Sequence, residues 1–222
     1  PKQAIDLGIG MVHQHFMLTP VLSVTENIVV GQEPVNGILF DKAAAEKEVQ
    51  EMIERYGFHI SASQIVKELS VGEQQKVEIL KAIYRNAKIL ILDEPTAVLT
   101  PQEVEELFHI LRRLKAAGTS IIIITHKLKE IKASSDTCTI IRRGEYIDTI
   151  SVKEVSEQEL ATLMVGHEVK LVVDKTPAKP GETVLEIKDL VVKNERKLDA
   201  VKGLNLKVRK GEILGIAGID GN

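Results

Sequence analysis

The sequence predicts an α/β fold with a mainly parallel sheet, a helical segment after its first strand, and antiparallel strands toward the C-terminus. Short apolar runs at Ile9–Val12, Lys88–Leu92 and Ser120–Thr125 indicate strands. The last two are expected to be buried, because the run at Lys88–Leu92 is almost continuously apolar. A strand, a helix and a strand in that order imply a right-handed crossover and parallel pairing.

Composition places the chain among ordinary globular proteins. Hydrophobic residues make up 44% and charged residues 27% of its 222 residues, enough for one large or two small domains. The net charge of −3 gives no electrostatic case for nucleic acid as the main partner. The single cysteine, Cys138, excludes an intramolecular disulfide framework. The N-terminus lacks the pattern of a signal peptide and no apolar run could span a bilayer, so a cytoplasmic protein is expected.

The expected helices begin at capping residues or end at glycine. Capping residues such as Asp, Ser and Thr satisfy the free N–H groups of a first turn, and glycine accepts the left-handed conformation that ends many helices. The segments with helical periodicity are Thr25–Val30, Asp41 to Gly57, the run opened by Ser70, the capping-box helix from Thr100 to Gly118, and Ser156–Val165.

The pattern changes after Ser134. Two strand-like runs, Thr137–Arg142 and Glu145–Ile150, flank Arg143-Gly144 and predict a hairpin. Further strands are expected at Val184–Val192 and Ala200–Val208, and the final stretch 211–222 reads as a strand that runs into a glycine-rich turn. We therefore predict a first domain at residues 1–165, a charged, proline-containing linker at 166–182, and the start of a second domain at 183–222.

Adjacent carboxylates, Asp93 and Glu94, follow the central apolar strand. The carboxyl ends of strands in an α/β sheet are where such folds bind ligands. In phosphoryl transfer one carboxylate typically holds Mg²⁺ and a second can polarise the attacking water. The alternative is a turn or helix-capping Asp-Glu pair before Pro95, which would be the commoner reading of these three residues alone.

A serine and a glycine, Ser70 and Gly72, stand at the start of the next expected helix upstream. Free backbone N–H groups at a helix start suit an anion such as phosphate. The competing interpretation is structural, because Ser70 and Glu73 have the spacing of a capping box.

Two more polar residues follow strands of the predicted sheet. Gln14 comes after Ile9–Val12, and His126 comes directly after Ser120–Thr125. A lone glutamine or histidine after a strand is most often a surface or capping group. His126 is expected at the same edge of the sheet as Asp93 and Glu94, which favours a role in the same site. Gln14 is favoured by its place in the order of the motifs along the chain.

The run Leu69–Thr100 closely resembles the signature helix, Walker B strand and D-loop of ATP-binding cassette (ABC) ATPases, which have a P-loop NTPase fold. Gln14 and His126 resemble the glutamine of the Q-loop and the histidine of the H-loop. The signature departs from the family pattern LSGGQ, since Val71 and Glu73 replace a glycine and a glutamine. In the D-loop, Thr100 replaces an aspartate.

The resemblance is strongest to the tandem ATPases of bacterial nucleoside and simple-sugar importers. It implies ATP and Mg²⁺ as cofactors, with Asp93 and Gln14 toward Mg²⁺, Glu94 as the general base, and Gln14 and His126 at the γ-phosphate. The residues that it implies contact ATP are Ser70, Gly72, Gln74 and Thr100. The segment from about residue 16 to residue 86 would form the helical subdomain that docks on the transmembrane permease.

The implied partners are permease subunits, a second ABC cassette in the same polypeptide and, indirectly, an extracytoplasmic solute-binding protein, with no nucleic acid. The implied location is the cytoplasmic face of the membrane. The alternatives are a non-catalytic regulatory cassette and a cytosolic ABC ATPase that is not coupled to transport. Chromosome-type ATPases are disfavoured because the stretch from Gln14 to Ser70 leaves no room for a long coiled coil.

The printed sequence contains no GxxxxGK[ST] phosphate loop. The glycines at positions 215, 218 and 221 resemble the start of such a loop in a second cassette. We therefore expect this chain alone to hydrolyse ATP inefficiently. We also expect the tail Val184–Ala217 to dock, within or between chains, beside Leu90–Leu92 and Ile121–Ile124, since open sheet edges favour pairing.

Overall fold

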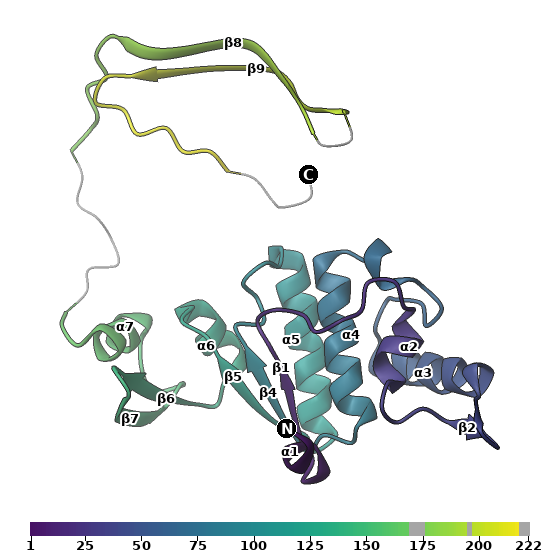
Figure 1. Cartoon of the computed structure of the whole chain (residues 1–222). Helices are drawn as coiled ribbons and strands as arrows, with labels where there is room; N and C mark the ends of the chain where they lie inside the picture. Colours follow the sequence, from purple (N-terminus) through teal and green to yellow (C-terminus); the bar gives the residue numbers. More distant parts are fainter. Residues whose placement is uncertain (169–175, 195–196, 218–222) are drawn as a thin grey trace. The chain divides into compact units, whose positions relative to one another are not determined.

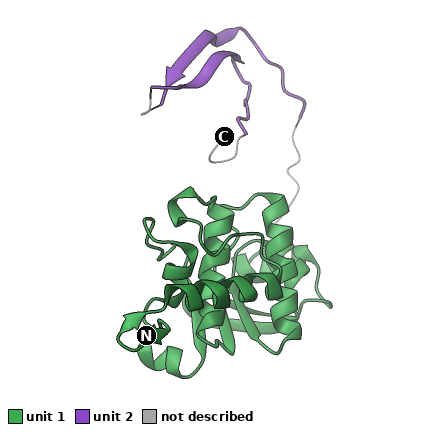
Figure 2. Cartoon of the chain, turned by 90° about the vertical axis from the view of Figure 1, so that its right-hand side faces the viewer, with its two compact units in different colours: residues 1–169 green, residues 170–222 purple. Residues whose placement is uncertain are grey.

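The computed structural model describes residues 1–168, 176–194 and 197–217 (Figure 1). The chain divides into two compact units, residues 1–169 and residues 170–222 (Figure 2). In the described residues, no helix has the length and apolar character needed to cross a membrane.

The first unit contains all the described helices, and the second contains a pair of long strands. The elements in chain order are α1 (Lys2–Asp6), β1 (Ile9–Val12), α2 (Val24–Val29), β2 (Val35–Asn36), β3 (Leu39–Phe40), α3 (Lys42–Tyr56), the 3₁₀ helix η1 (Val66–Glu68), α4 (Val71–Tyr84), β4 (Ile89–Asp93), α5 (Pro101–Ala116), β5 (Ser120–Ile124), α6 (Leu128–Ser134), β6 (Thr137–Arg142), β7 (Glu145–Ser151), α7 (Glu157–Val165), β8 (Thr183–Lys193) and β9 (Asp199–Arg209).

The predicted parallel sheet is present in the first unit. Its strands lie in the order β1-β4-β5, and both neighbouring pairs are parallel. In the middle strand, Leu92 is level with Val12 on one side and with Ile123 on the other. The helix α5 lies between β4 and β5 in the chain, as the strand–helix–strand pattern predicts. The α/β class with a mainly parallel sheet is confirmed.

One face of this sheet and the helices packed on it form the main core. Leu90 and Leu92 of β4 are at most 1% exposed. They belong to one apolar cluster with Leu80 of α4 and Leu114 of α5. Full burial of a leucine side chain contributes about 1.5–3 kcal/mol. The middle strand that ends at Asp93 is therefore fixed mainly from the helix-covered face.

Side-chain caps define where the helices begin. The cap predicted at Asp41 is present, since its Oδ1 accepts from the Ala44 N–H at 3.0 Å, and α3 ends at Gly57 with φ 72°. Four further helices, α2, α4, α5 and α7, start with reciprocal capping boxes. Their pairs are Ser23 with Glu26, Ser70 with Glu73, Thr100 with Glu103, and Ser156 with Glu159.

The segment between β1 and β4 is mainly helical. It contains α2, α3, η1, α4 and the short hairpin β2–β3. Ile28 of α2 and Ile53 of α3 are at most 1% exposed and share the apolar cluster of the sheet. The helical segment is therefore continuous with the core that supports the sheet.

The prediction that the third strand is buried is wrong. β5 forms at Ser120–Ile124, but Ile122 and Ile124 are 50% and 49% exposed. β5 is an edge strand with β4 as its neighbour, and Ile122 is level with Ile91 on the sheet face opposite Leu92. An apolar run does not reveal whether a strand is central or at an edge, because both share the same composition.

The predicted strand at the start of 211–222 is also absent from its described part. Residues 212–217 have no regular structure. A strand needs a neighbouring backbone, and the ladder partner of β9 is β8. Gly218 and Gly221 of the predicted glycine-rich turn lie outside the described residues.

The antiparallel strands are confirmed as the sequence predicts them. β6 pairs with β7 in a hairpin, and with α6 and α7 it surrounds a small apolar cluster of Ile131, Val152 and Leu160. In the second unit β8 pairs with β9. The linker and the docking of the tail stay predictions.

An ion pair between the buried Lys76 of α4 and the half-exposed Glu106 of α5 predicts a pH dependence of stability. Lys76 Nζ donates to Glu106 Oε2 at 2.7 Å, and this hydrogen bond together with the lysine charge lowers the pKa of the Glu106 carboxyl. A carboxyl whose folded pKa is lowered stabilises the fold above its unfolded pKa and loses that contribution as the pH falls through the folded pKa.

We therefore expect Glu106→Gln to cost about 0.5–1 kcal/mol at pH 7, a small value because Glu106 is half-exposed. This loss of stability should shrink as the pH falls below 4.5, the ordinary pKa of a glutamate side chain. Urea unfolding followed by circular dichroism at several pH values measures it, with Glu105→Gln on the same helix as the control. A cost that stays constant down to pH 3 would contradict this account.

Candidate functional site

The sequence-predicted polar residues gather at the carboxyl edge of the parallel sheet. Gln14 lies two residues after β1, Asp93 is the last residue of β4, and His126 lies two residues after β5. Since β1 and β5 are both neighbours of β4, the three strands end side by side. The structure thus places these residues at one edge of the sheet.

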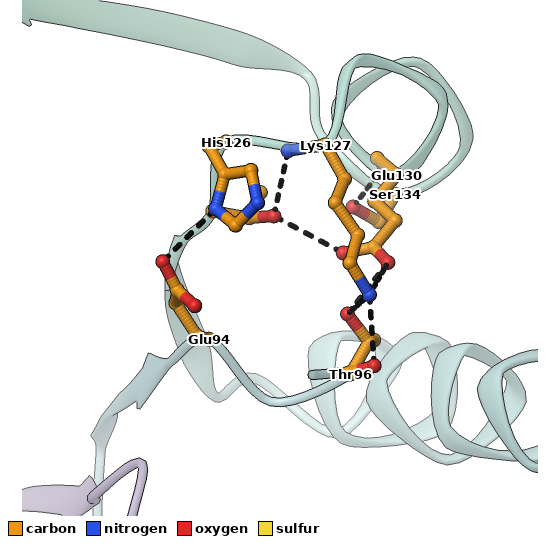
Figure 3. Close-up of polar contacts among 7 residues, drawn as sticks. Glu94, Thr96, His126, Lys127, Glu130 and Ser134 are labelled. Carbon is orange, nitrogen blue, oxygen red and sulfur yellow. Dashed lines mark hydrogen bonds and ion pairs between the residues drawn. The ribbon is translucent and has the colours of Figure 1, made fainter. Parts of the chain in front are cut away.

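Glu94 and His126 are in direct contact (Figure 3). Glu94 Oε1 lies 3.0 Å from His126 Nδ1, within hydrogen-bond distance. The Glu94 backbone has φ 45°, in the left-handed region, and its N–H donates to the Ile124 carbonyl at 2.9 Å. A non-glycine residue in this region is strained, and such residues occur often at functional sites. The turn after β4 therefore directs Glu94 toward the loop that carries His126.

A buried polar network lies beside this pair (Figure 3). Glu130, in the first turn of α6, is 8% exposed. Its Oε1 accepts from the Thr96 hydroxyl at 2.5 Å, and its Oε2 accepts from the Thr125 hydroxyl at 3.1 Å. Lys127 Nζ lies 3.2 Å from Glu130 Oε1 and donates to the Thr96 carbonyl at 2.8 Å. The network joins the loop after β4 to the loop after β5.

The segment that follows Gln14 is attached to α4. Glu78 Oε1 accepts from the Met17 N–H at 2.6 Å, and Lys81 Nζ donates to the Met17 carbonyl at 3.4 Å. Gln14 is exposed and lines a cavity of about 420 Å³. The same cavity is lined by Gln74 near the start of α4 and by Val98 in the loop after β4. Gln14 and the first turns of α4 thus line the same cavity.

The capping interpretation of Ser70 is confirmed. Its hydroxyl accepts from the Glu73 N–H at 3.3 Å, and its own N–H donates to Glu73 Oε2 at 2.8 Å. Thr100 and Glu103 make the same reciprocal bonds at the start of α5. Gln74 Nε2 donates to the Leu69 carbonyl at 3.1 Å. Contacts of Ser70, Gln74 and Thr100 with nucleotide stay predictions.

Gly72 has a structural role that the sequence does not reveal. It is buried near the start of α4, where a Cβ would lie 2.7 Å from Glu103 Cδ. Glu103 is held there because its Oε2 accepts from the Thr100 N–H at 2.8 Å. Glycine thus lets the first turn of α4 approach the first turn of α5.

We expect Gly72→Ala to destabilise the first unit by about 1 kcal/mol. Overpacking typically costs about 1–3 kcal/mol, and the higher helix propensity of alanine offsets part of it. In a Glu103→Ala background the same change should be neutral or stabilising, because the obstructing carboxylate is gone. Urea unfolding of the wild type, the two single variants and the double variant measures the coupling between Gly72 and Glu103. An equal cost in both backgrounds would show that Gly72 is not constrained by Glu103.

Asp93 and Gln14 fit a role toward Mg²⁺. Both supply the oxygen donors that this ion prefers, and they follow neighbouring strands. Among the residues described, no group of three or more His, Cys, Asp or Glu side chains could hold a metal ion by itself. Mg²⁺ in phosphoryl-transfer sites is usually held by one or two carboxylates together with substrate phosphates and water. One carboxylate and one amide suit that kind of site.

Sequence reasoning missed Glu130, Thr96 and Lys127. In the sequence, Glu130 stands four residues after His126 and looks like an ordinary acidic residue near a helix start. Its contact with Thr96 joins residues 34 positions apart, so no local pattern indicates it. The one available signal was that two hydroxyl residues, Thr96 and Thr125, lie close to the predicted catalytic residues.

Comparison with known proteins agrees with this geometry. Residues 2–97 match the family model described as ABC transporter. This region of the chain belongs to the ABC transporter family. Over its whole length the chain is 54% identical to the nucleoside import ATP-binding protein NupA of Lactococcus lactis, and 51% identical to the guanosine import ATP-binding protein NupO of Bacillus subtilis. It is 46% identical to the glucose import ATP-binding protein TsgD13 of Haloferax volcanii.

Each of these matches spans the whole chain but less than half of the relative, namely 44% of NupA, 44% of NupO and 46% of TsgD13. A solved structure described as the ADP conformation of an ATP-binding cassette of an ABC transporter superposes with a TM-score of 0.59 at 23% identity. The superposition covers 74% of this chain and 67% of the solved one. At that identity the likeness shows the fold, and the fold is that of an ABC ATPase cassette.

Proposed function

We propose that this chain is part of the ATP-hydrolysing subunit of an importer for nucleosides or simple sugars. The observation that carries the proposal is the contact between Glu94 and His126 at the carboxyl edge of the sheet. A carboxylate held beside an imidazole, directly after a strand that ends in Asp93, has the groups needed to activate water next to a phosphate.

The proposed roles follow from position. Glu94 polarises the attacking water, His126 orients Glu94 and contacts the γ-phosphate, and Gln14 lies toward Mg²⁺ and the same phosphate. Asp93 holds Mg²⁺, which would neutralise charge that develops on the phosphate oxygens. Ser70, Gly72, Gln74 and Thr100 are proposed to contact ATP bound by a second cassette.

Nucleosides are favoured over sugars by the relatives named above. The two whose names specify nucleoside or guanosine import are 54% and 51% identical, and the one named for glucose import is 46% identical. The proposed partners are permease subunits, a second cassette that begins at residues 183–222, and an extracytoplasmic solute-binding protein acting through the permease. The proposed location is the cytoplasmic face of the membrane.

The relatives are more than twice as long as this chain, so we propose that it forms part of a polypeptide with two cassettes, here named the tandem polypeptide. The test is ATP hydrolysis by the purified tandem polypeptide, together with uptake of labelled guanosine and labelled ribose by cells that carry it with its permease. We expect Mg²⁺-dependent hydrolysis and guanosine uptake that exceeds ribose uptake. The absence of hydrolysis by the tandem polypeptide would overturn the proposal.

The 222-residue chain is assayed in parallel. Without a sequence GxxxxGK[ST] it lacks the backbone cradle and the lysine that hold the β- and γ-phosphates, so we expect no appreciable turnover. Turnover close to that of the tandem polypeptide would show that the printed chain provides a complete site.

A further inference from the structure

Glu130 is a buried carboxylate that none of the proposed roles uses. It lies in the first turn of α6 and is 8% exposed. Glutamate is almost never fully buried unless it is paired, because removal of its charge from water is costly. Burial of the Glu130 carboxylate therefore depends on hydrogen bonds from the polar groups around it, and these hydrogen bonds also hold those groups in place.

Those groups belong to both loops of the site. Thr96, which donates to Glu130 Oε1 at 2.5 Å, lies two residues after Glu94. Thr125, which donates to Oε2 at 3.1 Å, and Lys127, whose Nζ lies 3.2 Å from Oε1, flank His126 in the sequence. Oε1 thus contacts both loops, through Thr96 and Lys127, and Oε2 contacts the loop after β5 through Thr125. Lys127 adds a direct link between the loops by donating to the Thr96 carbonyl.

Burial fixes the side chains of Glu94 and His126 only in part, since they are 31% and 67% exposed, respectively. Thr96, by contrast, is 2% exposed. The relative position of the pair therefore depends on the backbone of the two loops, and Glu130 is a buried group that contacts both loops (Figure 3).

We propose that Glu130 is a positioning residue that holds the general base Glu94 and His126 in their working geometry by bridging Thr96 to Thr125 and Lys127. This inference rests on the proposed function, since it concerns the same site. Glu130 does not touch the reacting atoms. It acts through two loops whose displacement by about 1 Å can lower a rate about 100-fold.

The first test compares Glu130→Ala with Glu130→Gln in the tandem polypeptide. Alanine removes both bridges, so we expect kcat for ATP hydrolysis to fall about 10- to 100-fold with the KM for ATP within about twofold. Glutamine keeps the shape: its oxygen can accept from Thr96 and Lys127, and its amide can donate to Thr125. We expect it to restore kcat to within about threefold of the wild type, the effect of weakening one hydrogen bond.

The matched control is Glu157→Ala, which also removes a first-turn carboxylate, from α7. It should leave both kinetic constants unchanged. A Glu130→Ala protein with kcat within twofold of the wild type would overturn the inference. So would two Glu130 variants that are equally impaired with KM raised in step, because that result indicates a general loss of structure.

Two further experiments keep the inference testable in other cases. If Glu130→Ala does not fold, Thr96→Val and Thr125→Val each remove one hydroxyl at similar volume, and each should lower kcat several-fold without raising KM.

If the wild type does not hydrolyse ATP, the proposed function fails and hydrogen exchange of the 222-residue chain decides this inference. Glu130→Ala should speed exchange in residues 93–97 and 124–128 and leave β6 and β7 unchanged, whereas unaltered exchange there would overturn the bridge.

Discussion

Glu94→Gln is expected to lower kcat for ATP hydrolysis by the tandem polypeptide about 100- to 10,000-fold, the usual contribution of a general base. The amide has nearly the same volume as the carboxylate, and its oxygen or nitrogen can still pair with His126 Nδ1, so the 3.0 Å contact can persist. What is lost is the negative charge and the capacity to accept a proton from the attacking water.

Nucleotide binding separates this effect from misfolding. The variant should bind ATP at least as tightly as the wild type, because Glu94 acts on water. Turnover and equilibrium binding of a fluorescent ATP analogue are measured on the same preparations, with Glu154→Gln, an exposed glutamate between β7 and α7, as the control. Loss of both binding and turnover would indicate a folding defect.

Unchanged turnover of the tandem polypeptide in Glu94→Gln would indicate that hydrolysis takes place at the second cassette. This cassette would then be a regulatory one that binds nucleotide without hydrolysing it and needs no base at position 94. The signature departures at Val71 and Glu73 and the threonine at position 100 are the sequence features that suit such a cassette. The kinetic result therefore discriminates between an enzyme and a binding module.

The sequence predicted those elements whose signals are local. Asp41 and Ser70 cap the helices they were expected to cap, because a capping side chain bonds to a backbone N–H within three residues. The strand that ends at Asp93 was predictable from its continuous apolar run. The convergence of Glu94 and His126 followed from the rule that parallel strands end together, although their direct hydrogen bond did not.

What the sequence did not predict depends on contacts between distant segments. The bridge from Glu130 to Thr96 and the approach of Gly72 to Glu103 each require a pair of elements to be placed in space first. The two-residue strands β2 and β3 are too short to show any periodicity. The exposure of Ile122 depends on which strands flank it, and composition carries no information on that point.

The second large effect is expected in the core beneath the site. Leu92 precedes Asp93 on β4, is 0% exposed, and packs in the cluster shared by the sheet and its helices. Leu92→Ala should lower the free energy of unfolding of the first unit by about 2–5 kcal/mol, since it removes buried methyl groups and leaves a cavity. Urea unfolding followed by circular dichroism at a helix wavelength reports on this unit, because the described helices all lie in it.

Ile91→Ala is the matched control, one residue away on the same strand. Successive side chains of a strand point to opposite faces, and Ile91 lies on the face where Ile122 is half exposed. Its truncation should cost about 1–2 kcal/mol, because less apolar surface returns to water. Equal losses at the two positions would mean that the second face is also covered in solution.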